Sequence, residues 1–85
     1  MPTVSVTLVS KPGCHLCDTA RDVVNSVVDE LDGVASVTEV SILDDPELFE
    51  KYVEEIPVVL INGRVHNIWR VDPTRLRTAL VEAAQ

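Results

Sequence analysis

Residues 13–17 read GCHLC and place two cysteines, Cys14 and Cys17, one helical turn apart. They are the only cysteines in the sequence. Residues 3–10 before them alternate between apolar and polar side chains, as expected of a strand with one buried face. Residues 14–31 carry apolar side chains at the spacing of one helix face. A Cys-x-x-Cys sequence where a strand turns into a helix indicates redox chemistry at a pair of thiols.

The size and composition of the chain predict one small globular domain. Its 85 residues leave no room for a second core, and 46% of them are hydrophobic. The formal net charge is −7 without any basic cluster, which argues against a nucleic-acid partner. No apolar run reaches the length that spans a bilayer, and the N-terminus has no signal-peptide pattern. We therefore expect residues 1–85 to form a single domain, a cytoplasmic monomer with no membrane or nucleic-acid partner.

The order of the expected elements is strand, helix, strand, helix, strand, strand, helix. The strands are expected at residues 3–10, 36–43, 57–61 and 64–71, and the helices at residues 14–31, at 46–54 and after Asp72-Pro73. The first strand, helix and strand form a βαβ unit, whose strands are parallel. The Asn62-Gly63 pair predicts a tight hairpin that adds two antiparallel strands. The fold class is therefore α/β, with a mixed four-stranded sheet flanked by three helices.

The sequence leads to further expectations for the third strand, the second helix and the fourth strand. The unbroken apolar run at residues 57–61 predicts a strand covered by helices on both faces of the sheet. The second helix, capped by Asp45 with Pro46 in its first turn, should pack its four large apolar side chains, Leu48, Phe49, Tyr52 and Val53. In the fourth strand, Trp69 belongs either in the core or exposed beside the cysteines, and His66 on the surface.

The two cysteines differ in their expected environments. Cys14 lies at the N-terminal end of the first helix, where free N–H groups and the helix dipole stabilise a thiolate. A thiol with a pKa near 8.5 needs roughly 2 kcal/mol of such stabilisation to be half ionised at pH 7. Cys17 continues the apolar face, so it should be more buried and keep a higher pKa. We therefore expect Cys14 to attack a disulfide and Cys17 to resolve the mixed disulfide that forms.

Other interpretations of the cysteine pair stay open. The pair could hold zinc or an iron–sulfur cluster in a metal carrier, although a zinc site would need His15, inside the motif, and His66. It could form an inert structural disulfide, although so short a loop constrains little of the unfolded chain. The domain could also be a non-catalytic binding module with idle thiols. Attachment of c-type haem is excluded because Asp18, not His, follows the second cysteine.

Two charged side chains near the motif could alter the reactivity of Cys14. A protonated His15 beside the thiolate would stabilise it, but an exposed His15 without electrostatic effect is an equal alternative. Asp18 could cap the first turn of the helix, where its negative charge would slightly oppose thiolate formation.

The sequence SKPGCHLC at residues 10–17, the Ile56-Pro57 pair before the third strand and the element order resemble glutaredoxin-like members of the thioredoxin superfamily. The resemblance covers nearly the whole chain and implies a thioredoxin-like, glutaredoxin-type βαβαββα fold. It implies that Cys14 is the nucleophile and Cys17 the resolving thiol of a dithiol–disulfide oxidoreductase. It also implies a cis Ile56–Pro57 bond that faces the cysteines and leaves the backbone of Ile56 to pair with an extended substrate.

The same resemblance suggests how the protein meets its substrates. Lys11 matches a family position that contacts the glutathione carboxylate and sits beside the thiolate, and Asp72 takes the place of an Asp in the glutathione site. The family's usual Gly-Gly before that Asp is absent, since residues 67–72 read NIWRVD. The family's usual Pro-Tyr between the cysteines is replaced by His-Leu, and its usual Thr-Val before the proline is replaced by Glu-Ile.

We expect no bound cofactor. The expected substrate is a disulfide-containing protein or a small-molecule disulfide, and the expected reductant is glutathione or a flavoprotein similar to thioredoxin reductase.

Overall fold

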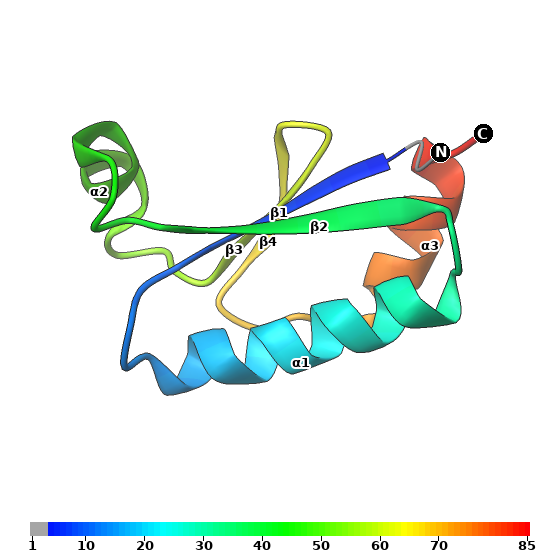
Figure 1. The fold of residues 1–85 in the computed structure, drawn as a ribbon, viewed down its shortest axis with the longest axis horizontal. Helices are drawn as coiled ribbons and strands as arrows, with labels where there is room; N and C mark the ends of the chain where they lie inside the picture. The colour runs from blue at the N-terminus through cyan, green and yellow to red at the C-terminus, as the bar shows by residue number, and fades with distance from the viewer. Residues whose placement is uncertain (1–3) are drawn as a thin grey trace.

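The computed structural model describes residues 4–85 and contains a four-stranded mixed sheet with three α-helices (Figure 1). The elements in chain order are β1 (Val4–Ser10), α1 (His15–Glu30), β2 (Ala35–Ser41), α2 (Pro46–Tyr52), β3 (Val58–Ile61), β4 (Arg64–Ile68) and α3 (Pro73–Ala83). This order confirms the one expected from the sequence. The expected start of the first strand at Thr3 lies outside the described residues. Among the described residues, no helix is both long and apolar enough to cross a membrane.

The strand order β2-β1-β3-β4 brings distant parts of the chain to one edge of the sheet. β1 and β2 are parallel, whereas β3 is antiparallel to both β1 and β4. Val58 pairs with Val9 on one side and with Ile68 on the other. The end of β1, the start of β3 and the end of β4 therefore lie side by side, and the loop that leads from β1 to Cys14 leaves the sheet at this edge.

Helices α1 and α3 cover one face of the sheet, and α2 lies on the opposite face (Figure 1). Under α1 and α3 lies the larger core cluster, which consists of Val4, Val6, Leu8, Ala20, Val24, Val27, Ala35, Val59, Leu76 and Leu80. The smaller cluster, on the α2 side, consists of Val9, Ile42, Tyr52 and Val58. Helices thus cover both faces, as the apolar third strand predicts.

The coverage by α2 is less complete than the sequence predicts. This seven-residue helix reaches the sheet with Tyr52 and Leu48, while Phe49 and Val53, expected to pack, are exposed. So short a helix covers only the end of the sheet near the loop between β1 and α1 (Figure 1). Farther along the same face, Leu60 is half-buried and its β4 partner Val65 is exposed.

Local sequence signals set the ends of most elements. Asp45 and Asp72 cap α2 and α3, and each precedes a proline in the first helical turn. The hairpin between β3 and β4 turns at Asn62 and Gly63, which have φ values of 51° and 83°, as a tight two-residue turn requires. These features confirm the expectations drawn from the sequence.

Strand β4 ends at Ile68 rather than at the expected Val71. The chain turns at Trp69, whose φ of 67° cannot continue a strand. The alternating apolar pattern that predicts a longer strand is local, whereas the turn depends on hydrogen bonds to other parts of the fold, described below.

Candidate active site

Cys14 is the N-cap residue of α1. Its backbone is extended, with φ −98° and ψ 114°, and its Sγ accepts a hydrogen bond of 3.2 Å from the backbone N–H of Cys17. Gly13, with a φ of 78°, allows the chain to turn just before it. The side chain is partly exposed. A sulfur in this position receives an N–H that the helix itself leaves unpaired.

Cys17 lies one turn farther along α1 and is fully buried, with an exposed fraction of 0%. Burial, and then the hydrogen bond with Cys14, raise the pKa of the Cys17 thiol from 9.0 to about 11. Both cysteines are free thiols. The structure therefore contains one accessible sulfur and one protected, protonated thiol within the same helical turn.

The peptide bond between Ile56 and Pro57 is cis, as the family resemblance implies, and the Pro57 side chain is fully buried. Val58, the next residue, pairs with Val9 near the end of β1. Ile56 and Pro57 therefore lie at the edge of the sheet where the loop to Cys14 begins. The N–H of Ile56 donates to Tyr52 O at 3.1 Å. The N–H and the carbonyl of Ile56 are the two backbone groups that could pair with a substrate. Because the N–H is already bonded to Tyr52 O, the carbonyl is the group that remains for a substrate.

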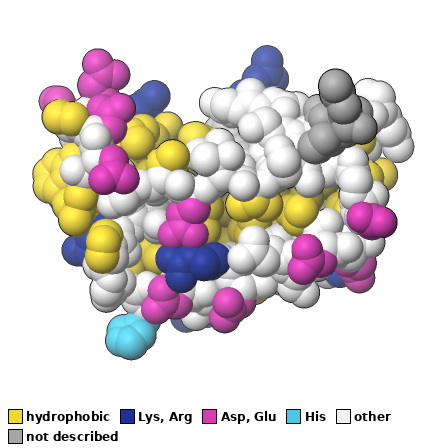
Figure 2. Space-filling view, in the orientation of Figure 1, with side chains coloured by type: hydrophobic (Ala, Val, Ile, Leu, Met, Phe, Trp, Pro, Cys, Tyr) yellow, Lys and Arg dark blue, Asp and Glu magenta, His cyan; other side chains and the backbone are white. Residues whose placement is uncertain are grey.

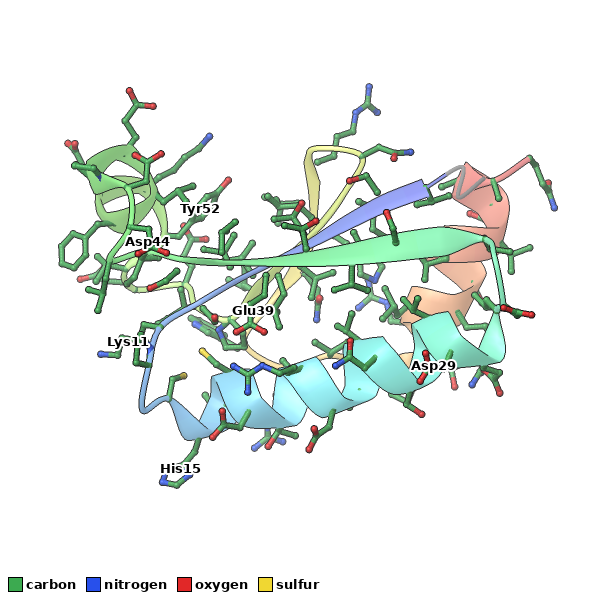
Figure 3. The ribbon with its side chains drawn as sticks, in the orientation of Figure 1. Lys11, His15, Asp29, Glu39, Asp44 and Tyr52 are labelled. Carbon is green, nitrogen blue, oxygen red and sulfur yellow. The ribbon has the colours of Figure 1, made fainter. Side chains whose placement is uncertain are left out.

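A cluster of charged side chains, not predicted from the sequence, lies between α1 and β2. Arg21 donates two hydrogen bonds of 2.6 Å to Glu39 and one of 2.8 Å to Asp18. Ser10, the buried last residue of β1, donates to Glu39 at 2.8 Å. Glu39 points from β2 toward α1 (Figure 3) because it pairs with Leu8, whose side chain is in the core under α1. The only sequence signal for the cluster is the three-residue spacing of Asp18 and Arg21.

The charges of this cluster affect one another and the nearby thiol. The hydrogen bonds from Arg21 hold the pKa of the Glu39 carboxyl below its usual range. The positive charge of Arg21 also lowers the pKa of Cys17, but by less than burial raises it. Asp18 lies in the first turn of α1 and is paired with Arg21, and the N-cap residue is Cys14 rather than Asp18.

The remaining predicted site residues are Lys11, His15 and Asp72. His15 is exposed and points away from the sheet, and Lys11 projects from the loop before α1 (Figure 3). Lys11 lines a pocket of about 330 Å³ with residues that include Ser41 and Asp44. Asp72 is not among those residues, and its Oδ1 accepts hydrogen bonds from the first turn of α3. Lys11 and Asp72 therefore do not share this pocket.

Trp69 forms an unusual turn at the same edge of the sheet. The N–H of Arg70 donates to Ile68 O at 3.0 Å, which makes Trp69 the centre of a γ-turn with positive φ. The turn is anchored from outside by the N–H of Trp69 to Pro57 O at 2.8 Å and by its indole Nε1 to Glu54 O at 3.2 Å. Such a backbone costs about 1–3 kcal/mol for a residue other than glycine. The indole is nevertheless 53% exposed.

Within residues 4–85, no three His, Cys, Asp or Glu side chains lie together as a metal site would need. The two cysteines are close to each other, without a third ligand of this kind among the described side chains.

Comparison with known proteins shows what this architecture is similar to. Residues 5–81 match the family model described as Glutaredoxin-like domain (DUF836). A thioredoxin of Methanocaldococcus jannaschii is 32% identical over 84 residues, which cover 98% of this chain and 94% of that protein. An uncharacterized protein of Mycobacterium tuberculosis is 28% identical over 86 residues, covering 98% of this chain and 89% of that one.

Solved structures show the same similarity. A structural-genomics target protein from X. campestris has a TM-score of 0.72 and 32% sequence identity, over 91% of this chain and 96% of that chain. A chloroplastic thioredoxin z has a TM-score of 0.79 with 13% identity, over 95% of this chain and 78% of that chain, and supports the fold alone. The fold is therefore thioredoxin-like, and together with two neighbouring cysteines it supports a redox-type function. With a family model that matches nearly its whole length, the chain belongs to the glutaredoxin-like domain family.

Proposed function

We propose that the protein is a dithiol–disulfide oxidoreductase that uses Cys14 and Cys17. The observation that carries the proposal is the pairing of an N-cap sulfur, which accepts the N–H of Cys17, with a fully buried second thiol. Thiol–disulfide exchange requires one thiolate that a substrate can reach and a second thiol that attacks only afterwards. The difference in burial between the two cysteines supports these two roles.

The reaction proceeds in two exchange steps. The Cys14 thiolate attacks one sulfur of the substrate disulfide, so a Cys14–substrate disulfide forms and the other substrate sulfur leaves as a thiolate. Cys17 then loses its proton and attacks Cys14 Sγ, which forms the Cys14–Cys17 disulfide and releases the second substrate thiolate. Two electrons pass to the substrate, and two protons from the medium or the cysteines complete its two thiols. Burial of Cys17 delays its attack until the first step has placed a disulfide beside it.

The oxidised protein returns to the dithiol form at the expense of an external reductant. Two molecules of glutathione, or the dithiol of a flavoprotein similar to thioredoxin reductase, would supply the two electrons. The carbonyl of Ile56, beside the cis bond, supports pairing with an extended substrate strand, and Lys11 supports an interaction with a substrate carboxylate. Lys11 and, when protonated, His15 add positive charge to the surface at the N-terminal end of α1.

A turnover assay with a model protein disulfide tests this proposal. We expect the wild-type protein to reduce it with either glutathione or a flavoprotein reductase and NADPH, and the faster system identifies the reductant. Cys14→Ser should abolish turnover. Lys51→Ala, which removes a lysine of α2 outside the motif, serves as a surface-charge control and should retain full activity. Equal activity of wild type and Cys14→Ser would contradict the proposal, as would stoichiometric zinc or iron in protein purified without chelator.

A further inference from the structure

A second recognition element lies beside the cysteine motif, in a pocket of about 330 Å³ between α1 and the turn that follows β4. The walls of the pocket include Leu16, Ala20 and Val23 from α1 and Trp69, Arg70 and Val71 from the turn. Leu16 stands between the two cysteines in sequence, so the pocket lies at the end of α1 that carries them. Ala20 is buried and forms part of the larger core cluster, so this part of the pocket wall belongs to the packed core.

The exposed side chains at this pocket are large and apolar. Leu16 and Trp69 are 47% and 53% exposed, on opposite walls. Figure 2 shows further apolar side chains gathered at the end of the molecule that carries α2 and the loop into α1. Apolar surface around a reactive group is typical of a site that excludes water when a partner binds.

The turn that presents Trp69 is both strained and firmly held. Its positive φ is unfavourable for a tryptophan, yet four hydrogen bonds fix the turn, including one from Asn67 Nδ2 to Arg70 O. A glycine would adopt this backbone without strain. Backbone strain of this kind clusters at functional sites and is kept where surrounding contacts hold it, and here it presents the indole at the pocket.

Arg70 adds a charge to the rim of the pocket. Among residues 4–85 the structure records no ion pair for its guanidinium, whereas Arg21 and Arg77 are both paired with carboxylates. An unpaired cation at a pocket in a chain with a net charge of −7 is complementary to a carboxylate brought by the partner.

We propose that this pocket binds a large apolar side chain from an extended segment of a protein substrate, next to the cysteine that Cys14 attacks, while Arg70 pairs with an acidic residue of the same segment. The inference rests on the proposed function and narrows its substrate class to protein disulfides. The pocket has room for one aliphatic or aromatic side chain. A small disulfide without an apolar group leaves it unfilled and reacts without its help.

Matched peptides test the proposal. Each carries one cysteine as a disulfide with thionitrobenzoate, whose release gives the rate of attack by Cys14. One series places Leu or Ser on either side of the cysteine, and a second places Glu or Lys at the next position. With wild-type protein, the best Leu–Glu peptide should react at least about tenfold faster than the Ser–Lys peptide, a difference of about 1.4 kcal/mol in the activation barrier.

Variants of Trp69 and Arg70 show which side chains cause the preferences among the peptides. Trp69→Gly removes the indole and relieves the backbone strain, so it should fold, keep the wild-type rate with a small polar disulfide that has no apolar group and lose most of the preference for Leu. Arg70→Glu should reverse the preference for Glu over Lys. Phe49→Ala removes a similarly exposed aromatic side chain outside the pocket and should change neither preference.

The outcomes distinguish a failure of the proposed function from a failure of the proposed pocket. Failure of the wild-type protein to react with the small disulfide contradicts the proposed function itself. Reaction without discrimination among the peptides overturns the pocket alone, as does discrimination that survives in Trp69→Gly or is lost equally in Phe49→Ala.

Discussion

The Arg21 guanidinium of α1 contacts both carboxylate oxygens of Glu39 on β2, with Nε–Oε1 and Nη2–Oε2 distances of 2.6 Å. The hydroxyl of Ser10 donates to the same carboxylate. Glu39 therefore connects the helix that carries the cysteines with the last residue of the strand that precedes them. This connection fixes the position of α1 on the sheet at the end where the chemistry is proposed to occur.

We predict that Glu39→Gln destabilises the protein by about 1 kcal/mol at pH 7, because the charge-assisted bonds to Arg21 are lost. The pKa of Glu39 is lowered in the folded state, so the stabilisation is present above the pKa of the unfolded chain and is lost as pH falls through the folded-state pKa. Urea unfolding should therefore show a difference between wild type and variant that shrinks from pH 7 to pH 3.

Glu50→Gln provides the control for this measurement, since Glu50 is an exposed carboxylate of α2 without a recorded ion pair. It should leave the unfolding free energy nearly unchanged at both pH values. A loss for Glu39→Gln that is independent of pH would show that the charge of Glu39 does not stabilise the fold.

We predict that alkylation separates the two thiols. A pKa of about 11 leaves about a hundredfold less Cys17 thiolate at neutral pH than the ordinary value of 9.0. Iodoacetamide at pH 7.5 should therefore modify Cys14 and spare Cys17, as read by mass spectrometry of the digested protein. In Cys14→Ser, which removes the hydrogen bond with Cys14, the titration of Cys17 should move toward lower pH. Equal labelling of both cysteines in the wild type would be inconsistent with the burial of Cys17.

The same pKa predicts a loss of stability in alkali. Because the folded-state pKa of Cys17 is raised, its contribution is fully present below pH 9 and is lost as pH rises toward about 11. Denaturant unfolding from pH 8 to pH 11 in the presence of a reductant should show this decline, and Cys17→Ala should decline less. An identical decline in both proteins would assign the effect to other groups.

We predict that Asp72 stabilises α3 as a cap. Its Oδ1 accepts the N–H groups of Thr74 and Arg75 at 2.8 and 3.2 Å, so Asp72→Ala should cost about 1 kcal/mol in thermal or urea unfolding. Asp72→Asn keeps the acceptor and should lose much less. If Asp72→Ala lowers activity without lowering stability, the residue acts on substrate rather than as a cap.

We predict that the core under α1 and α3 dominates stability. Leu8 is 1% exposed in this cluster, so Leu8→Ala should cost about 2–5 kcal/mol in urea unfolding. Leu43→Ala removes the same atoms from a side chain that is 63% exposed and should cost far less. Similar losses at both positions would mean that Leu43 is covered in solution.

The parts of the fold set by local signals could be predicted from the sequence. Apolar periodicity located β1 and α1, and the Asp-Pro pairs at residues 45–46 and 72–73 located the starts of α2 and α3. The burial of Cys17 followed from its place on the apolar face of α1. Each of these depends on residues within a few positions of one another, where spacing and capping determine the outcome.

The parts that depend on distant residues could not be predicted. The bonds between Arg21 and Glu39 join residues on separate elements, and no local pattern marks them. The turn at Trp69 relies on Pro57 O and Glu54 O, which override a sequence that favours a strand. The exposure of Phe49 follows from how little of the sheet α2 covers, which is a property of the assembled fold.

Trapping of the first intermediate tests the roles of the two cysteines most directly. Cys17→Ser should accumulate a stable one-to-one mixed disulfide through Cys14 when mixed with a protein disulfide, as read by intact mass and peptide mapping. The wild type should instead end as the internal Cys14–Cys17 disulfide, two hydrogens lighter than the dithiol. A stable adduct on Cys17 in Cys14→Ser, with none on Cys14 in Cys17→Ser, would reverse the assigned roles and contradict the proposed mechanism.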